Sequence, residues 1–238
     1  MKRRPSPLST RPWCVLAVMA IGVTSATAAA QDEDFAGAKE VFPGVTLDAA
    51  AGHVDLRARV VGRHVDWLEL LACRPGTREH ESIVTVDADA RHIQLALLLL
   101  GLEAGSPARA EEVDGEIVFY SPTGPRVELF FVLDESPQTP IPARDWVVSQ
   151  TTGEPLPDNV WLFVGSQVID FDGQRHFLAE ANGTVASLVN FGDELLGRAT
   201  DVSEAGGNGF WTTDPDTIPP EGTRLTLRIK PIVPPPPE

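Results

Sequence analysis

The 238-residue chain carries 19 Lys and Arg residues against 34 Asp and Glu residues, a formal net charge of −15 at pH 7. This acidity argues against nucleic acid and against anionic lipid as partners, because both are bound through basic surfaces. With two cysteines, Cys14 and Cys73, the chain also lacks the composition of a disulfide-stapled scaffold.

The first thirty residues are typical of a cleavable secretory signal. Basic residues at the start, among them Arg3 and Arg4, precede an apolar run at residues 13–23, and small residues follow at 26–30. The apolar run is shorter than the roughly 20 residues that a membrane-spanning helix needs. We therefore predict cleavage after Ala30 and export to the periplasm or the cell exterior, with no stable membrane span in the mature protein.

Cleavage at this position changes both the charge and the thiol content of the chain. It removes four of the basic residues and none of the acidic ones, and it takes Cys14 away. Cys73 would then be the single cysteine, so a monomer could form no internal disulfide. A Cys73–Cys73 bond between two copies is the alternative.

The remaining chain is predicted to form one domain at residues 44–231, after a loose segment at 31–43 and before a proline-rich tail at 232–238. Apolar or alternating runs separated by Gly, Pro, Asn and Asp predict strands throughout this domain. The runs lie at residues 54–61, 67–73, 82–86, 117–120, 127–133, 160–166, 176–179, 185–189 and 225–229. Asp172-Gly173 and Asn182-Gly183 predict tight hairpin turns, because both dipeptides tolerate positive φ.

One helix is predicted, at about residues 88–101. Asp87 and Asp89 are suitable N-caps, since a carboxylate accepts hydrogen bonds from the unpaired amides of the first turn. The apolar residues from Ile93 to Leu100 surround the helix nearly completely, so we expect it to be buried. Together these elements predict an α+β fold in which a mostly antiparallel sheet carries this helix on one face.

Several segments resemble the YdjY-domain family. They are residues 69–82 running into 89–101, and later residues 161–166, 177–180 and 187–191, and the most specific piece is Cys73 followed by His80-Glu81-Ser82. The resemblance covers most of residues 45–230. It implies an exported bacterial domain, common in planctomycetes, that has no established activity. Some relatives are associated with iron–sulfur segments, but a cluster needs about four thiolates, so no iron–sulfur cofactor is predicted here.

Cys73, His80, Glu81 and Glu69 form the candidate site. Cys73 ends one predicted strand and His80 begins the next across a six-residue turn, and an imidazole near a thiol can activate it as a thiolate. Cys, His and Glu are also zinc ligands, which makes a zinc site of Cys73, His80 and His92 a second hypothesis. The alternative is a structural role, with Cys73 packed in the core and His80-Glu81 as an internal hydrogen-bonded pair.

The sequence contains no complete catalytic signature. A phosphate-binding loop, a dinucleotide fingerprint and the Gly-x-Ser-x-Gly elbow are all missing. The leading prediction is therefore a non-catalytic periplasmic or envelope module that binds another protein or a small ligand. The rival prediction is a metal- or thiol-dependent enzyme or redox protein that uses Cys73, His80 and Glu81.

Overall fold

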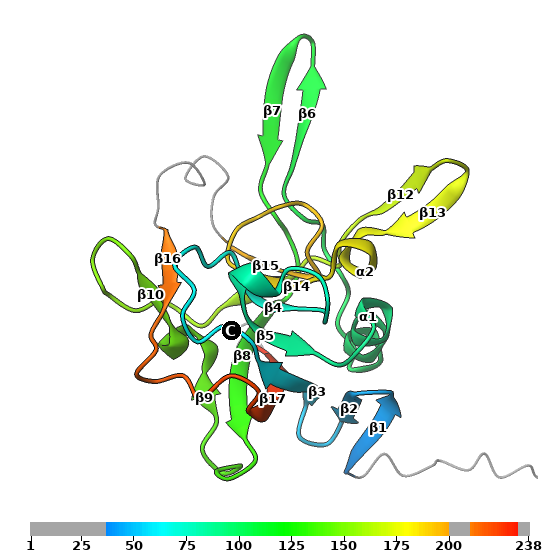
Figure 1. The fold of residues 1–238 in the computed structure, drawn as a ribbon. Coiled ribbons are helices and arrows are strands. Elements are labelled where there is room, and N and C mark those ends of the chain that lie inside the picture. Colours follow the sequence, from blue (N-terminus) through cyan, green and yellow to red (C-terminus); the bar gives the residue numbers. More distant parts are fainter. Residues whose placement is uncertain (1–36, 200–209, 233–238) are drawn as a thin grey trace, which may run out of the picture. The chain divides into compact units, whose positions relative to one another are not determined.

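Eight strands close into a barrel in the computed structural model, which describes residues 37–199 and 210–232. All pairings in the ring are antiparallel except β14–β15 and β4–β5, which are parallel. The ring closes where the last strand pairs with the first. In order around the ring, the strands are β3 (His53–Val60), β17 (Arg224–Pro231), β8 (Arg126–Leu133), β11 (Trp161–Phe163), β15 (Leu196–Arg198), β14 (Thr184–Ser187), β4 (Leu70–Cys73) and β5 (Ser82–Val86) (Figure 1).

The other elements of the described residues extend or decorate this barrel. β1 (Ala38–Phe42) and β2 (Val45–Asp48) continue the sheet from β3, and β9 (Ile141–Pro142) pairs with β8. Separate two-stranded sheets are formed by β6 (Arg109–Val113) with β7 (Glu116–Tyr120), β12 (Val168–Phe171) with β13 (Gln174–Phe177), and β10 (Val147–Ser149) with β16 (Trp211–Thr213). The helices are α1 (Ala90–Leu99), α2 (Leu178–Asn182) and 3₁₀ turns at Glu79–Glu81 and Ala143–Trp146.

The predicted α+β class is wrong, because the protein is mostly β. Of the described residues, 44% lie in strands and 12% are helical. Many strands lie where the alternation predicts them, but their closure into a ring does not follow from the pattern. One edge of β3 serves two partners: His53 to Leu56 pair with β2, and Ala58 to Val60 pair with β5. The hydropathy pattern predicts which side of a strand is buried, but it does not predict such a change of partner along one strand.

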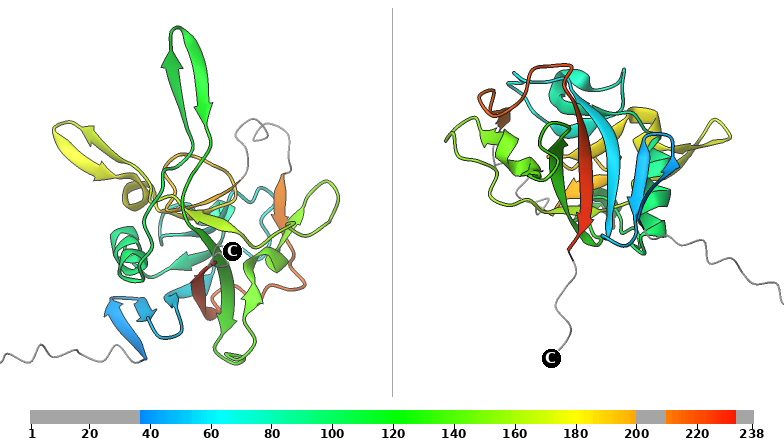
Figure 2. Two further views of the ribbon diagram at one scale, coloured as in Figure 1. Left: turned by 180° about the vertical axis from the view of Figure 1, so that it is seen from behind. Right: turned by 90° about the horizontal axis from the view of Figure 1, so that it is seen from below.

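The barrel interior is filled by the inward positions of the strands. Along β3, Val54, Leu56, Ala58 and Val60 are buried, and the intervening charged residues face outward. The same alternation runs along β17. Figure 2, in its right view, shows β2, β3, β17 and β8 side by side, so their outward side chains share one surface.

The predicted helix exists but is half-buried. Ala90, Ile93, Ala96 and Leu97 are buried, whereas three leucines on the other side, Leu95, Leu98 and Leu99, are exposed. Its first amide is capped from elsewhere in the fold: the Ala90 N–H donates to the Glu180 carboxylate at 2.7 Å. The helix is therefore an attachment to the barrel, held partly by α2, and the expectation of complete burial is wrong.

The turn predictions have mixed outcomes. Asp172-Gly173 connects β12 to β13 with positive φ at both residues, as predicted. Gly183 instead ends α2 in the left-handed conformation, so Asn182-Gly183 makes no hairpin. Asp114-Gly115, which the sequence analysis did not single out, is the turn of the β6–β7 hairpin. Both hairpins project from the barrel (Figures 1 and 2).

Some predictions fall on residues that the structure does not describe. The signal segment at residues 1–30 and the tail from residue 233 onward lie outside the described ranges. Within residues 37–199 and 210–232, no helix combines the length and apolar character needed to cross a membrane.

Candidate functional site

Cys73 lies at the end of β4 inside the barrel wall and is completely buried. Burial raises the pKa of its thiol, and hydrogen bonds with Ser82 and Thr77 offset that effect in part. A thiol becomes a good nucleophile or metal ligand as the thiolate, in a site that solvent or substrate can reach. The environment of Cys73 opposes both conditions.

The two candidate histidines lie in a different environment. His80 has a side chain 79% exposed, and its Nε2 is 3.9 Å from Glu81. The ring of His92 stacks on Phe42 with centroids 4.7 Å apart. Throughout the described ranges, no group of three or more His, Cys, Asp and Glu side chains is placed to hold a metal ion. The structure therefore does not bring Cys73, His80 and His92 together as a ligand set.

Glu69 and Glu81 do come together, bridged by an arginine that the sequence analysis did not consider. Arg78 donates from Nε to Glu81 and from Nη2 to Glu69 at 3.2 Å, and its guanidinium lies 4.0 Å from the ring centroid of Phe191. Burial, together with Glu81, raises the pKa of Glu69. Burial also disfavours the charged form of Glu81, but hydrogen bonds from Arg78 and Glu69 outweigh it and lower the pKa of Glu81. The pair is a closed unit in which each charge has a partner.

An acidic residue that the sequence analysis also did not consider lies next to this unit. Glu194 is completely buried, and its Oε2 accepts hydrogen bonds from the Gly192 N–H at 2.7 Å and the Phe191 N–H at 3.0 Å. Its Oε1 is buried without a hydrogen-bond partner among the described residues. Burial raises the pKa of Glu194. Its two backbone bonds hold the turn that carries Phe191 over Arg78.

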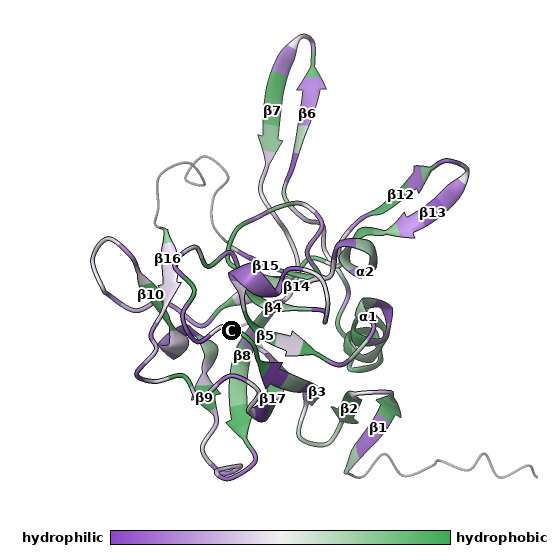
Figure 3. Cartoon of the chain, viewed as in Figure 1, coloured by the Kyte–Doolittle hydropathy of each residue, from purple (hydrophilic) through white to green (hydrophobic). Residues whose placement is uncertain are grey.

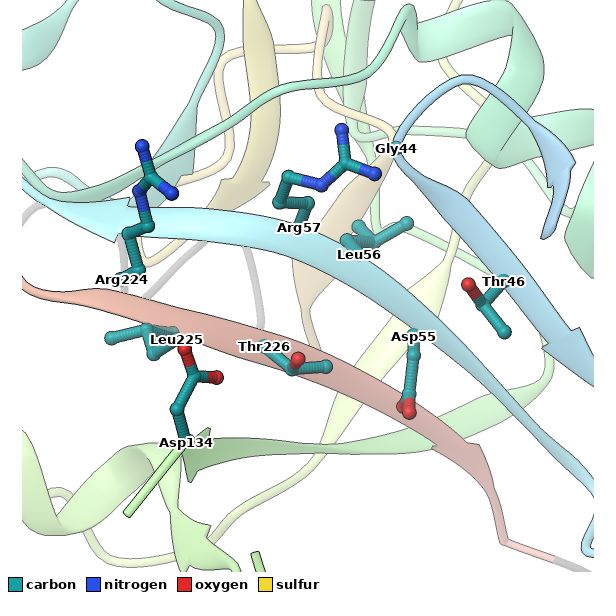
Figure 4. A pocket seen from close by; sticks show the side chains of 9 residues that line it. All are labelled: Gly44, Thr46, Asp55, Leu56, Arg57, Asp134, Arg224, Leu225 and Thr226. Carbon is teal, nitrogen blue, oxygen red and sulfur yellow. The ribbon is translucent and has the colours of Figure 1, made fainter.

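The open site on the barrel is a groove of about 350 Å³ on the outer face of β2, β3 and β17 (Figure 4). It lies where β3 exchanges β2 for β5. The Arg57 N–H donates to the Gly44 carbonyl at 2.9 Å, and the Asp87 N–H donates to the Arg57 carbonyl at 2.8 Å. A side chain at Gly44 would overlap the Asp87 carbonyl oxygen, so this close junction requires glycine. The lining residues are Gly44, Thr46, Asp55, Leu56, Arg57, Asp134, Arg224, Leu225 and Thr226.

Strand register gathers arginines around this groove. Arg224 lies directly opposite Arg59, Thr226 opposite Arg57, and Arg228 opposite Asp55. Like charges directly opposite each other destabilise an antiparallel pair. The acidic chain therefore places two cations in a position that opposes folding.

Most of these arginines already have carboxylate partners, and Arg224 is the exception. Arg228 binds Asp55 through two hydrogen bonds of 2.8 Å, and Arg59 lies 3.8 Å from Asp87. Arg224 is exposed and has no hydrogen-bond or ion-pair partner within the described residues. Figure 4 shows the guanidinium groups of Arg57 and Arg224 turned to the same side of β3.

A carboxylate already occupies the rim of the groove. Glu40, from β1, accepts hydrogen bonds through Oε1 from the Gly44 N–H at 2.9 Å and from Arg57 Nη2 at 3.2 Å. Both donors belong to groove-lining residues. The groove therefore has the geometry to hold a carboxylate, and it holds one of the chain's own.

Comparison with known proteins assigns the chain to a family. The YdjY domain matches residues 45–230. The chain belongs to the YdjY-domain family, as the sequence resemblance indicated. No curated protein and no solved structure gives a significant match.

The YdjY match covers seven strands of the ring completely and β17 up to Lys230. It includes Arg57 and Arg224, and it begins after Glu40 and Gly44. The YdjY domain is of uncharacterised function, so the family contributes a domain assignment and no activity.

Proposed function

We propose that this protein is an exported, non-catalytic binding module whose groove at Arg57 and Arg224 recognises a carboxylate or phosphate group. The observation that carries the proposal is the unpartnered Arg224, held opposite Arg59 in a chain of net charge −15. Such an arrangement costs folding free energy unless an anion compensates it. Export rests on the signal-like residues 1–30.

The donors suit a compact anion with two or more oxygens. Arg57 and Arg224 occupy diagonal positions of an antiparallel pair. The Cα atoms of such diagonal neighbours typically lie roughly 7–8 Å apart. Each guanidinium presents several N–H donors in a planar fork that matches a carboxylate or phosphate. The hydroxyls of Thr46 and Thr226 line the same groove. Asp55 and Asp134 in the lining disfavour an extended polyanion, so a small ligand or a single acidic side chain fits best.

A titration with small anions tests the proposal. Inorganic phosphate and succinate, added to ¹⁵N-labelled protein, are expected to shift amide resonances around Arg57 and Thr226. Arg57→Ala and Arg224→Ala should each weaken binding at least about tenfold, because losing a charge-assisted hydrogen bond costs about 1.5–3 kcal/mol. Arg175→Ala, at an exposed arginine of the β12–β13 hairpin, is the matched control. Equal affinity in all variants would rule out the groove as the site.

Two further measurements separate this proposal from its rivals. Titration of the native protein with a thiol reagent should leave Cys73 unmodified until denaturant is added, whereas rapid native modification would favour thiol chemistry. Mass spectrometry of the protein recovered from producing cells should find Gln31 at the N-terminus. An intact Met1 would remove the export component and leave the groove untouched.

A further inference from the structure

The β6–β7 hairpin is an arm whose side chains are mostly exposed. Every residue of β6 is exposed, and Ile117 and Phe119 of β7 are 59% and 63% exposed. Figure 3 shows that β6 is largely hydrophilic, whereas β7 is largely hydrophobic. Apolar side chains exposed in this way contribute little to the barrel core, and they are typical of a surface that meets another molecule.

The tip of the arm is acidic. Glu112, Asp114 and Glu116 have no ion-pair or hydrogen-bond partner within the described ranges, unlike Glu111, which binds Arg109 at 2.7 Å. The turn itself is the two-residue Asp114-Gly115, with φ of 54° and 84°, so the tip is narrow. A slender element that carries three uncompensated carboxylates can present one of them to a groove of about 350 Å³ that contains an uncompensated arginine.

The arm and the groove of one molecule lie on opposite sides of the barrel. In Figure 1 and in the left view of Figure 2, the β6–β7 tip points away from the end occupied by β3 and β17. The tip therefore does not serve the groove of its own chain. A second copy can offer both its tip and its groove to neighbours.

We propose that the anionic group recognised by the groove is supplied by a second copy of this chain, whose acidic β6–β7 tip enters the groove beside Arg57 and Arg224. This inference rests on the proposed anion site and names its partner. The contact is heterologous, since each copy inserts its tip into one neighbour and accepts the tip of another neighbour in its groove. Such contacts build rings or open chains. A symmetric contact between two β6–β7 arms would oppose like charges.

Charge exchange between the two surfaces tests the contact. The tip variant carries Glu112→Lys and Glu116→Lys, and the groove variant carries Arg57→Glu and Arg224→Glu. Sedimentation velocity over a wide range of concentration should show reversible association of the wild-type protein and association at least about tenfold weaker for either variant alone. An equimolar mixture of the two variants should regain association, because both kinds of contact become complementary. Arg175→Glu, on the other hairpin, should behave as the wild type.

The outcomes distinguish this inference from the proposed function. The contact between tip and groove is overturned if the wild-type protein remains monomeric. It is also overturned if the groove variant associates as strongly as the wild type. If phosphate binding in that protein still requires Arg57 and Arg224, the anion site stands alone. If phosphate binding and association are both missing, both proposals fail. Rescue in the mixture supports the contact specifically, because misfolded variants would not regain association on mixing.

Discussion

Two arginine clusters on this barrel have similar composition and opposite character. Arg78 lies between Glu69 and Glu81 beneath Phe191, with a side chain only 21% exposed. Arg224 extends from β17 into an open groove and meets no carboxylate of the described chain within ion-pair distance. The first cluster is electrostatically complete, and the second is incomplete.

This difference distinguishes an arginine that stabilises the fold from an arginine that is available to bind a ligand. A partly buried arginine with two carboxylates stabilises the fold because removing it would leave charges without compensation. An exposed arginine opposite another arginine contributes no stabilising interaction to the fold, so it can be retained for binding. The comparison therefore predicts opposite effects on stability and binding for substitutions in the two clusters.

The largest effect is expected at Arg78. Arg78→Met would leave Glu69 and Glu81 adjacent without a cation, and we expect a loss of about 2–3 kcal/mol in the free energy of unfolding. Urea denaturation followed by tryptophan fluorescence measures it. Arg57→Met, which removes an exposed ion pair with Glu40, should cost less than about 1 kcal/mol. Equal losses in the two variants would contradict the distinction between the clusters.

Arg224 should show the reverse behaviour. Arg224→Thr removes the repulsion with Arg59 and places a β-branched residue in a strand, so stability should stay constant or rise by up to about 1 kcal/mol. Phosphate affinity of the same variant should fall at least about tenfold, as for Arg224→Ala. Unfolding and titration of one preparation give both quantities. A marked loss of stability would show that Arg224 belongs with Arg78 as a structural cation.

Glu194 adds a third case to the comparison of the two arginine clusters. Its carboxylate is hydrogen-bonded by backbone amides only. Since burial raises its pKa, the folded chain holds this proton more tightly than the unfolded chain. The associated stability is therefore complete at low pH and is lost as pH rises from the ordinary carboxyl range through the raised pKa. Glu194→Gln should stabilise the protein by about 1 kcal/mol near neutral pH, the low end of the cost of an unsatisfied buried acceptor.

The pH dependence of the stabilisation identifies its cause. Melting temperatures measured from acidic to neutral pH should converge at the acidic end and separate as pH rises. Glu116→Gln, at an exposed carboxylate of the β6–β7 hairpin, should show no such separation. A constant difference at all pH values would assign the effect to packing.

Many of the strands could be predicted from the sequence, but their closure into a barrel could not. Eight-residue strands such as β3 and β17 alternate clearly, so their buried sides are predictable. β11 and β15 have three residues each, too few for a period to be visible. The leucine run of α1 suggested complete burial because exposed Leu98 and Leu99 have the same hydropathy as buried Leu97. Closure depends on which strands become neighbours, and hydropathy does not encode that.

The sites follow the same division. Glu69 and Glu81 were proposed together with Cys73 and His80 as one site, but Arg78, which binds both carboxylates, was not considered. The outward arginines of β3 and β17 were visible as alternation, yet their partners depend on long-range register: Asp55 and Arg228 are 173 residues apart. A reactive Cys73 was one hypothesis because His80 follows closely in sequence, but the fold places the thiol in the wall and the imidazole in solvent. Proximity along the chain did not specify environment.

The smallest predicted effect concerns the carboxylate that already lies at the groove. Glu40 belongs to β1, pairs with Arg57 at 3.2 Å and has a side chain 51% exposed, so an incoming anion competes with it for the same donors. Glu40→Gln should raise phosphate affinity about two- to fivefold, because an exposed ion pair is worth about 0.5–1 kcal/mol. Asp145→Gln, at an exposed carboxylate that pairs with Arg144 outside the groove lining, should leave the affinity unchanged. Weaker binding in Glu40→Gln would mean that Glu40 orients Arg57 for the ligand, and the available charge of the groove would then reside in Arg224 alone.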